Sequence, residues 1–289
     1  MNYKDTEKFV LSCIDASAYS KDVCDYSAWI AKRTNLPLKL LHTIEHNSQP
    51  AVSDYSGAIG LGASEELLNE LTNAEQQHSK LLIQQGEVML KAARQSAIDS
   101  GVSDVITRQR HGSLPEALVE LESQIHVLVL GLRGESHESD DAGVGAQLES
   151  TIRALHKPIL VVNGEFTEPQ KIMLAYDDSE GAKKALSMIV EGPLFHHIPC
   201  HIVYVGDDTE QNQTMLQQAA EELSAVNIDT TTAIVQGTAE SALTRYQSQN
   251  NIDLMVMGAY GHNILRDFLL GSFTAKMLAK TRKPLLLLR

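Results

Sequence analysis

The 289-residue sequence contains little cysteine, few aromatic residues and less positive than negative charge. Its cysteines, Cys13, Cys24 and Cys200, are scattered and odd in number, so neither a disulfide scaffold nor a zinc ribbon is expected and the thiols should be reduced. The aromatic content is 5% and the formal net charge is −13. Few rings for base stacking and no broad basic face argue against binding to nucleic acid or to an anionic membrane surface.

Long apolar runs are missing as well. No uninterrupted stretch approaches the ~20 residues that cross a bilayer, and the N-terminus does not have the pattern of a signal peptide. We therefore expect a cytoplasmic protein without membrane insertion. The length exceeds that of one typical domain and suits two domains of ordinary size.

An internal repeat organises the chain. Residues 9–17 and 172–179 are each an apolar segment followed by an aspartate and, two residues later, a serine. Residues 156–162 and 282–288 also match, because each places Lys-Pro before four apolar residues. A duplicated tandem explains both matches, and it predicts one domain over 1–164, lengthened by an insert near 46–75, and another over 165–289.

Each copy alternates short segments rich in Val, Ile and Leu with longer segments of helical periodicity. This alternation predicts an α/β fold with two tandem open, mainly parallel, five-stranded sheets and helices on both faces. In the second copy the expected strands are 172–176, 201–205, 231–235, 253–257 and 285–288, and the expected helices are 182–189, 211–225, 239–249 and 272–280.

The second copy also contains a glycine pattern suited to an anion. The apolar run Ile252–Met257 is followed by Gly258-Ala259-Tyr260-Gly261 and, after nine more residues, by Gly271-Ser272-Phe273-Thr274. Glycines let a ligand approach the main chain, and free N–H groups where a helix begins favour negative charge. Ligands bind at the carboxyl ends of the strands in such sheets, so Asp177, after the first strand of this copy, belongs to the same edge.

This spacing resembles the nucleotide signature of the universal stress protein family, and the resemblance covers almost the whole chain as two tandem domains. It implies an adenine-nucleotide alpha-hydrolase-like (Rossmann-like) fold that binds ATP or a related adenine nucleotide, an arrangement compatible with Mg²⁺ or Mn²⁺ held by the phosphates. It also implies a stress-response regulator whose two domains pair through their final strands and whose chains can form a homodimer. The regulatory protein partner is not identified by the sequence.

The resemblance assigns the nucleotide site to the second copy. Asp177 would recognise adenine, Val205 would lie against the adenosine, and the hydroxyls of Ser272 and Thr274 would add donors for the phosphates. An alternative for Asp177-Asp178-Ser179 is an N-cap for the next helix, and the two roles can coexist on different residues. The expected site residues are Ala175, Tyr176, Asp177, Val205, Met257, Gly258, Gly261, His262, Gly271, Ser272, Phe273 and Thr274.

The first copy departs from this pattern. Ten residues instead of nine precede Gly145, Ala146-Gln147-Leu148 replaces the hydroxyl-bearing residues, and the acidic segment 135–141 would repel phosphates. We expect a weaker second site or none, and hence one tightly bound nucleotide per chain. The residues that remain for a weaker site are Asp15, Gly131, Gly134 and Gly145.

The insert contains three closely spaced glycines, Gly57, Gly60 and Gly62. They are compatible with a lid that contacts the nucleotide or with a flexible connection carrying a small apolar plug. Ser64 is predicted to cap the long helix expected over 65–100.

Catalytic motifs are absent from the sequence. It has no nucleophile elbow, no Walker loop and no zinc-protease helix pattern, so no catalytic residue is assigned. No metal site is assigned to His196, His197, Cys200 and His201, because neighbouring strand residues point in different directions. Binding is thus the expected activity; the alternatives are a weak ATPase or self-phosphorylating enzyme, and a nucleotide-free scaffold or small-ligand binder.

Overall fold

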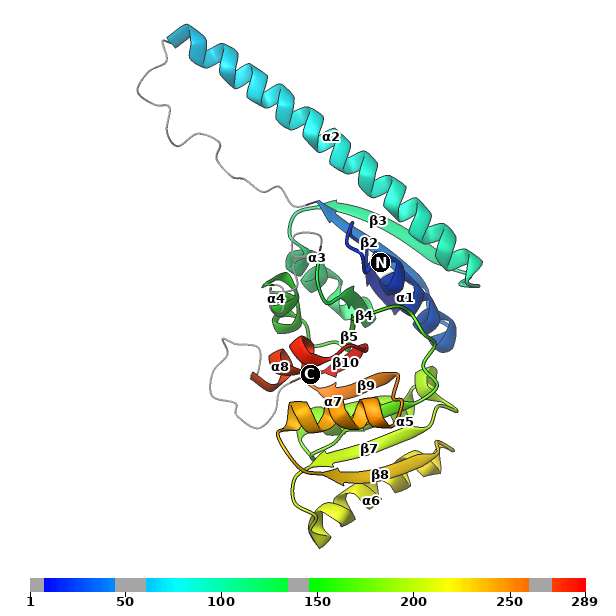
Figure 1. Cartoon of the computed structure of the whole chain (residues 1–289). Coiled ribbons are helices and arrows are strands. Elements are labelled where there is room, and N and C mark those ends of the chain that lie inside the picture. The colour runs from blue at the N-terminus through cyan, green and yellow to red at the C-terminus, as the bar shows by residue number, and fades with distance from the viewer. Residues whose placement is uncertain (1–7, 45–60, 135–145, 260–271) are drawn as a thin grey trace.

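The structure, a computed structural model, describes residues 8–44, 61–134, 146–259 and 272–289. The strands of these residues are β1 (Phe9–Cys13), β2 (Leu38–Ile44), β3 (Val105–His111), β4 (Ile125–Gly131), β5 (Ile159–Val162), β6 (Ile172–Ala175), β7 (Cys200–Val205), β8 (Thr230–Val235), β9 (Leu254–Gly258) and β10 (Leu285–Leu288). They form one sheet in the order β3-β2-β1-β4-β5-β10-β9-β6-β7-β8 (Figure 1). The first five strands make one half of the sheet and the last five make the other.

Helices cover both faces of the sheet. Those in the described residues are α1 (Ser20–Thr34), α2 (Leu61–Asp99), α3 (Leu114–Leu121), α4 (Ala146–Ala154), α5 (Glu180–Glu191), α6 (Glu210–Ala225), α7 (Ala239–Gln249) and α8 (Ser272–Lys280), with short 3-10 turns η2 (Glu122–Gln124) and η3 (Pro193–Phe195). Buried side chains of α1, α2, α5 and α6 pack on one face, and those of α3, α4, α7 and α8 on the other. Strand alternation divides the core, since Val10 belongs to the first layer and Leu11 to the second. The predicted fold class is confirmed.

The two halves meet at an antiparallel pair of strands, β5 and β10. Leu285 lies opposite Val161 and Leu287 lies opposite Ile159, and all four side chains are buried. The other strand pairs among the described residues are parallel. The expected pairing of the two apolar closing segments is confirmed, and it removes two sheet edges from solvent. Because this pair is antiparallel, the first five strands run in the direction opposite to the last five. The carboxyl ends of the two sets of strands therefore lie at opposite ends of the strand direction.

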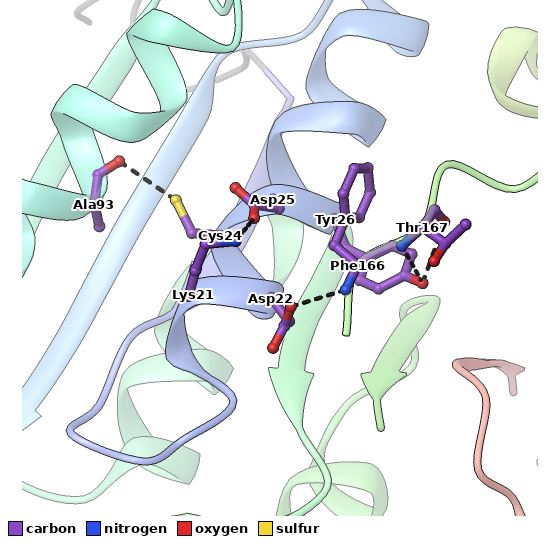
Figure 2. Close-up of polar contacts among 8 residues, drawn as sticks. All are labelled: Lys21, Asp22, Cys24, Asp25, Tyr26, Ala93, Phe166 and Thr167. Atoms are coloured by element: carbon purple, nitrogen blue, oxygen red, sulfur yellow. Dashed lines mark hydrogen bonds and ion pairs between the residues drawn. The ribbon is translucent and has the colours of Figure 1, made fainter. Parts of the chain in front are cut away.

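Helix α1 holds the segment that links the two halves. The Asp22 carboxylate accepts a hydrogen bond from the backbone N–H of Phe166 at 2.8 Å, and the rings of Tyr26 and Phe166 meet edge to face at 4.8 Å between centroids (Figure 2). The Tyr26 hydroxyl lies 3.4 Å from both the backbone N and the backbone O of Thr167. Burial is the main reason why the pKa of Tyr26 is raised to about 12.

The same helix reaches the second half directly. The Nε of Arg33 donates to the carbonyl of Leu194 at 3.0 Å, and a second guanidinium nitrogen donates to the carbonyl of His196. The Trp29 ring lies 6.4 Å from the Phe195 ring in η3. Helix α1 is therefore in contact with the linker and with the turn that follows α5.

Predicted and observed elements of the second copy agree to within two residues at every end. The first copy differs at α2, which begins at Leu61, so Ser64 lies inside the helix and the prediction that it caps the helix is wrong. Gly62 is helical too. Serine and glycine lower helix propensity by no more than about 1 kcal/mol each, which is too little to stop a helix of this length.

Helix α2 accounts for much of the extra length of the first copy. It has 39 residues, whereas α6, at the corresponding position of the second copy, has 16. Its first half projects well beyond the sheet (Figure 1). The glycines at 57 and 60 lie outside the described residues. No helix in the described part of the chain is both long and apolar enough to cross a membrane.

We expect Asp22→Ala to lower the free energy of unfolding by about 1–2 kcal/mol, because it leaves a partly buried linker N–H without its acceptor. Urea denaturation measures this loss, and limited proteolysis of the linker gives a second readout. Asp25→Ala is the matched control on the same helix, since Asp25 pairs at 2.9 Å with the exposed Lys21, and such pairs contribute about 0–1 kcal/mol. Equal losses in the two variants would contradict the role given to Asp22.

Candidate functional site

An open pocket lies where β6, β7 and β9 end, beside α7 and α8. The space within it is ≈ 740 Å³, a volume that includes the open solvent at its mouth. Its walls are mostly apolar, and Asp177 is the one charged side chain among the described residues that line it. The lining residues are Ala175, Tyr176, Asp177, Ser179, Val203, Tyr204, Val205, Ala239, Leu243, Met257, Gly258 and Phe273.

The turn after β6 directs Asp177 to the pocket and starts α5. One carboxylate oxygen of Asp177 accepts from the backbone N–H of Ser179 at 3.1 Å. The Ser179 hydroxyl in turn accepts from the N–H of Ala182 at 3.2 Å, so Ser179 is the N-cap of α5. The prediction that capping and ligand recognition can fall on different residues fits this arrangement. The second oxygen of Asp177 has no partner among the described residues and is accessible, because the side chain is exposed.

The neighbours of Asp177 fix this turn. Asp178 adopts a left-handed conformation with φ 62°, which aspartate tolerates better than most residues, and pairs with Lys183 at 3.0 Å. The Tyr176 hydroxyl donates to Asp178 at 3.2 Å. Burial, followed by the charge of Asp178, raises the pKa of Tyr176 to about 12. Tyr176 is therefore a neutral donor at physiological pH.

Gly258, at the end of β9, lines the pocket, and close packing also explains why this residue is a glycine. A Cβ at this position would lie 2.8 Å from the carbonyl carbon of Gly181 in the first turn of α5. A Cβ on Gly181 would equally meet the Cα of Gly258 at 3.0 Å. This close contact between two backbones is a reason for glycine at position 258 that the sequence alone does not show.

The beginning of α8 forms the other side of the pocket. Phe273 lines it, and Ser272 is the first residue of the helix. Thr274 is buried and its hydroxyl donates to the carbonyl of Ala259, which ties α8 to the end of β9. This corrects the expectation for Thr274, because its donor is directed to the backbone and not to the pocket. Gly261, His262 and Gly271 lie outside the described residues.

Of the predicted residues, the structure brings Ala175, Tyr176, Asp177, Val205, Met257, Gly258 and Phe273 together. Five lining residues were not among the predicted site residues: Ser179, Val203, Tyr204, Ala239 and Leu243. Val203 stands two residues before Val205 on one strand, and Leu243 stands one helical turn after Ala239, so both lie on the faces that point to the pocket. Strand and helix periodicity could have found these two, once a neighbour was assigned.

The corresponding edge of the first half carries larger side chains. Strand register and helix starts place Cys13 where the second half has Ala175, and Leu114 where it has Ala239. Asp15 is more constrained than Asp177, since it accepts from both the N–H of Ser17 at 3.0 Å and the Ser17 hydroxyl at 2.5 Å.

Two further positions expected to belong to a site in the first half lie in closely packed surroundings. A Cβ on Gly131 would lie 3.0 Å from the Cβ of Tyr19. Leu148, which occupies the position of Thr274, is buried. Gly134 is among the described residues of the first half and does not line the pocket of the second half. Gly145 lies outside the described residues.

The histidines and cysteine before and within β7 do not gather at one point. Cys200 is fully buried in the core, whereas Nδ1 of the next residue, His201, lies 2.8 Å from the hydroxyl of Tyr246. Burial lowers the pKa of His201. Among the described residues no group of three or more potential metal ligands is found.

The sequence is similar to known proteins over almost its whole length. A profile of the universal stress protein family matches residues 8–163 and 168–289. The universal stress protein Slr1230 of Synechocystis sp. is 35% identical over 286 residues, which cover 98% of this chain and 100% of that protein. The universal stress protein MJ0577 of Methanocaldococcus jannaschii is 27% identical over 81 residues, or 28% of this chain and half of that protein.

Solved structures share the fold over the full length. A universal stress protein from Archaeoglobus fulgidus superposes with a TM-score of 0.70 at 17% identity, covering 100% of this chain and 98% of the other. The protein PA1789 of Pseudomonas aeruginosa gives a TM-score of 0.60 at 14% identity, covering 100% and 94%. On the two profile matches and the full-length relative, the chain belongs to the universal stress protein family and carries two domains of that family in tandem.

Proposed function

We propose that the second domain binds an adenine nucleotide, ATP or a close relative, and that the chain acts through this binding as a stress-response regulator. The observation that carries the proposal is the pocket at the carboxyl ends of β6, β7 and β9. There the free carboxylate oxygen of Asp177, apolar strand ends and the beginning of α8 line one space. An adenine nucleotide has donors on its base and sugar, a flat apolar ring and an anionic tail, and each of these suits one part of the pocket.

Asp177 would accept hydrogen bonds from the base and the sugar. Its free oxygen accepts hydrogen bonds from amino or hydroxyl groups, and a carboxylate next to a triphosphate would be repulsive. Val203, Val205 and Met257 offer apolar surface to the ring. The base therefore belongs at the β6 and β7 side of the pocket.

The phosphates would lie at the beginning of α8. The first helical residue is Ser272, and the N–H groups of a first turn have no partners within the helix, which favours an anion. The described lining supplies one carboxylate, so a divalent cation would be held chiefly by the phosphates and not by a cage of protein oxygens. Turnover is not part of the proposal, because the described lining has no histidine, lysine or second carboxylate to activate water.

The variant Asp177→Asn tests the acceptor role of Asp177. The amide keeps one oxygen for the N–H of Ser179 but replaces the free acceptor with a donor, so the turn is kept and recognition is lost. We expect ATP affinity to fall about 10- to 100-fold, corresponding to about 1.5–3 kcal/mol for a hydrogen bond to a charged group. Calorimetric titration measures the change, and mass spectrometry of ligands released from the purified protein identifies the native nucleotide.

Asp15→Asn is the matched control, because Asp15 occupies the same place in the first domain. It should leave ATP affinity unchanged. If no adenine nucleotide binds to the unmutated protein, the proposed function is wrong.

The difference between the two domains predicts the effect of a larger side chain at position 239 and the number of nucleotides bound per chain. Ala239→Leu brings the residue of the first domain, Leu114, to the pocket of the second and should weaken binding by roughly tenfold or more, since an overfilled cavity costs about 1–3 kcal/mol. The unmutated chain should bind one nucleotide tightly. Two equal sites in the titration would contradict the asymmetry of the domains.

A further inference from the structure

Strand β3 is one of the two outer strands of the described sheet, so one of its edges has no neighbouring strand (Figure 1). The N–H of Leu38 in β2 donates to the carbonyl of Asp104, just before β3, at 2.9 Å. Backbone groups alternate in direction along a strand, so the even-numbered residues of β3 bond to β2 and the odd-numbered residues point outward. We call the outward side of residues 105–109 the β3 edge. It presents backbone donors and acceptors to an incoming strand.

Helix α2 takes up the two ends of the β3 edge and leaves its centre open. The Nε of Arg94 donates to the carbonyl of Val105 at 3.3 Å, and the side-chain amide of Gln109 donates to the carbonyl of Ile83 at 3.2 Å. Thr107, between these two points, is exposed, and its outward N–H and C=O have no partner among the described residues. A segment of another chain can therefore reach the backbone at Thr107.

The side chains next to the β3 edge, on the side of the sheet where α3 packs, include an exposed apolar residue and two cations. Ile106 is 44% exposed, and Arg108, exposed as well, follows it on the same face. Lys39 lies opposite Ile106 in β2, with its Nζ 3.7 Å from the centre of the Phe9 ring. Burial, followed by the charge of Arg108, lowers the pKa of Lys39. The two cations are therefore close enough to repel each other, and an anion beside them would be favourable.

The positive charge of this patch is not neutralised within the described part of the chain. Glu120 on α3 pairs with Arg110 at 2.6 Å, and this pair uses the carboxylate nearest to the patch. Arg108 has no hydrogen bond or ion pair among the described residues. In a chain with a formal net charge of −13, an unpaired arginine beside a half-buried lysine is a local exception.

The second domain shows that the fold does not require these cations. Strand β8 is the other outer strand and pairs with β7 in the same way, because the N–H of Cys200 donates to the carbonyl of Asp229 at 2.9 Å. Ala233 therefore stands where β3 has Arg108, and Thr232 has the central outward position. Strand β8 contains no charged residue at all. The charges next to the β3 edge thus need an explanation other than packing.

We propose that the β3 edge binds an extended acidic segment of a partner protein, which adds to the sheet as a further strand. Hydrogen bonds to the backbone of Thr107 would hold the segment, its carboxylates would lie beside Arg108 and Lys39, and an apolar side chain would cover Ile106. A second copy of β3 does not fit this description, because the strand contains no acidic residue and would bring the same cations together. The proposal is independent of nucleotide binding.

Two labelled synthetic peptides test the chemistry of the occupant by fluorescence anisotropy with the full chain. One peptide alternates glutamate with valine, and the other alternates lysine with valine. The glutamate peptide should bind saturably, and more weakly as the salt concentration rises, whereas the lysine peptide should not bind. Equal binding of the two peptides, or no binding of the glutamate peptide, would overturn the proposal.

Two variants test the backbone and the charge separately. Thr107→Pro removes the outward N–H and keeps the bonds to β2, since proline is tolerated on an outer strand where the N–H faces solvent. Arg108→Glu reverses the charge of an exposed side chain, so it tests the patch even if the proline variant fails to fold. Each should weaken binding of the glutamate peptide by roughly tenfold or more.

Thr232→Pro is the matched control, because it places the same substitution at the corresponding position of β8. It should bind the glutamate peptide like the unmutated chain, and circular dichroism checks that the variants are folded. Unchanged affinity in Arg108→Glu would contradict the proposal, as would an equal loss in folded Thr107→Pro and Thr232→Pro.

Vesicles of phosphatidylserine distinguish strand addition from simple attraction of negative charge. They are anionic but offer no backbone groups to Thr107, so they should not displace the glutamate peptide from the full chain. Displacement would assign the patch to a membrane surface and would refute the proposed protein partner.

Discussion

The antiparallel pairing of β5 with β10 is the constraint on which the rest of the structure depends. It joins two open sheets into one and leaves β3 and β8 as the outer strands of the described sheet. It also sets the carboxyl ends of the two sets of strands at opposite sides, so each candidate site must be complete within its own domain. The α1 contacts to the linker and to η3 add a second connection on one face, through Asp22, Tyr26 and Arg33.

Much of the fold could be predicted because a parallel sheet covered on both faces imposes a strong pattern. Strands such as β9 are short and apolar throughout, and helices such as α7 are longer and amphipathic, so the element type follows from length and period. The same topology explains why Asp177, Val205 and Met257 line one pocket. Each stands at the carboxyl end of a strand, and the strand order brings those ends together without further information.

The errors and gaps concern contacts between residues distant in the sequence. The partner of the Thr274 hydroxyl is a carbonyl of another element, and the space beside Gly258 is taken by Gly181. No local pattern shows either contact. The start of α2 was misplaced because a serine followed by glutamates has the local appearance of a cap, although the helix continues through it. Ala239 and Leu243 were on a predicted helix, but the face that meets the pocket is decided by packing.

The linker between β5 and β6 has a consequence for evolution. When a family member has one domain and pairs with an identical chain, every mutation appears in both subunits, so the two sites must change together. Here the two domains are separate stretches of one gene. The first domain could therefore acquire Cys13 and Leu114 at the positions that correspond to the smaller Ala175 and Ala239, while the pocket of the second domain kept its shape. Covalent fusion thus lets the two domains change under different selection.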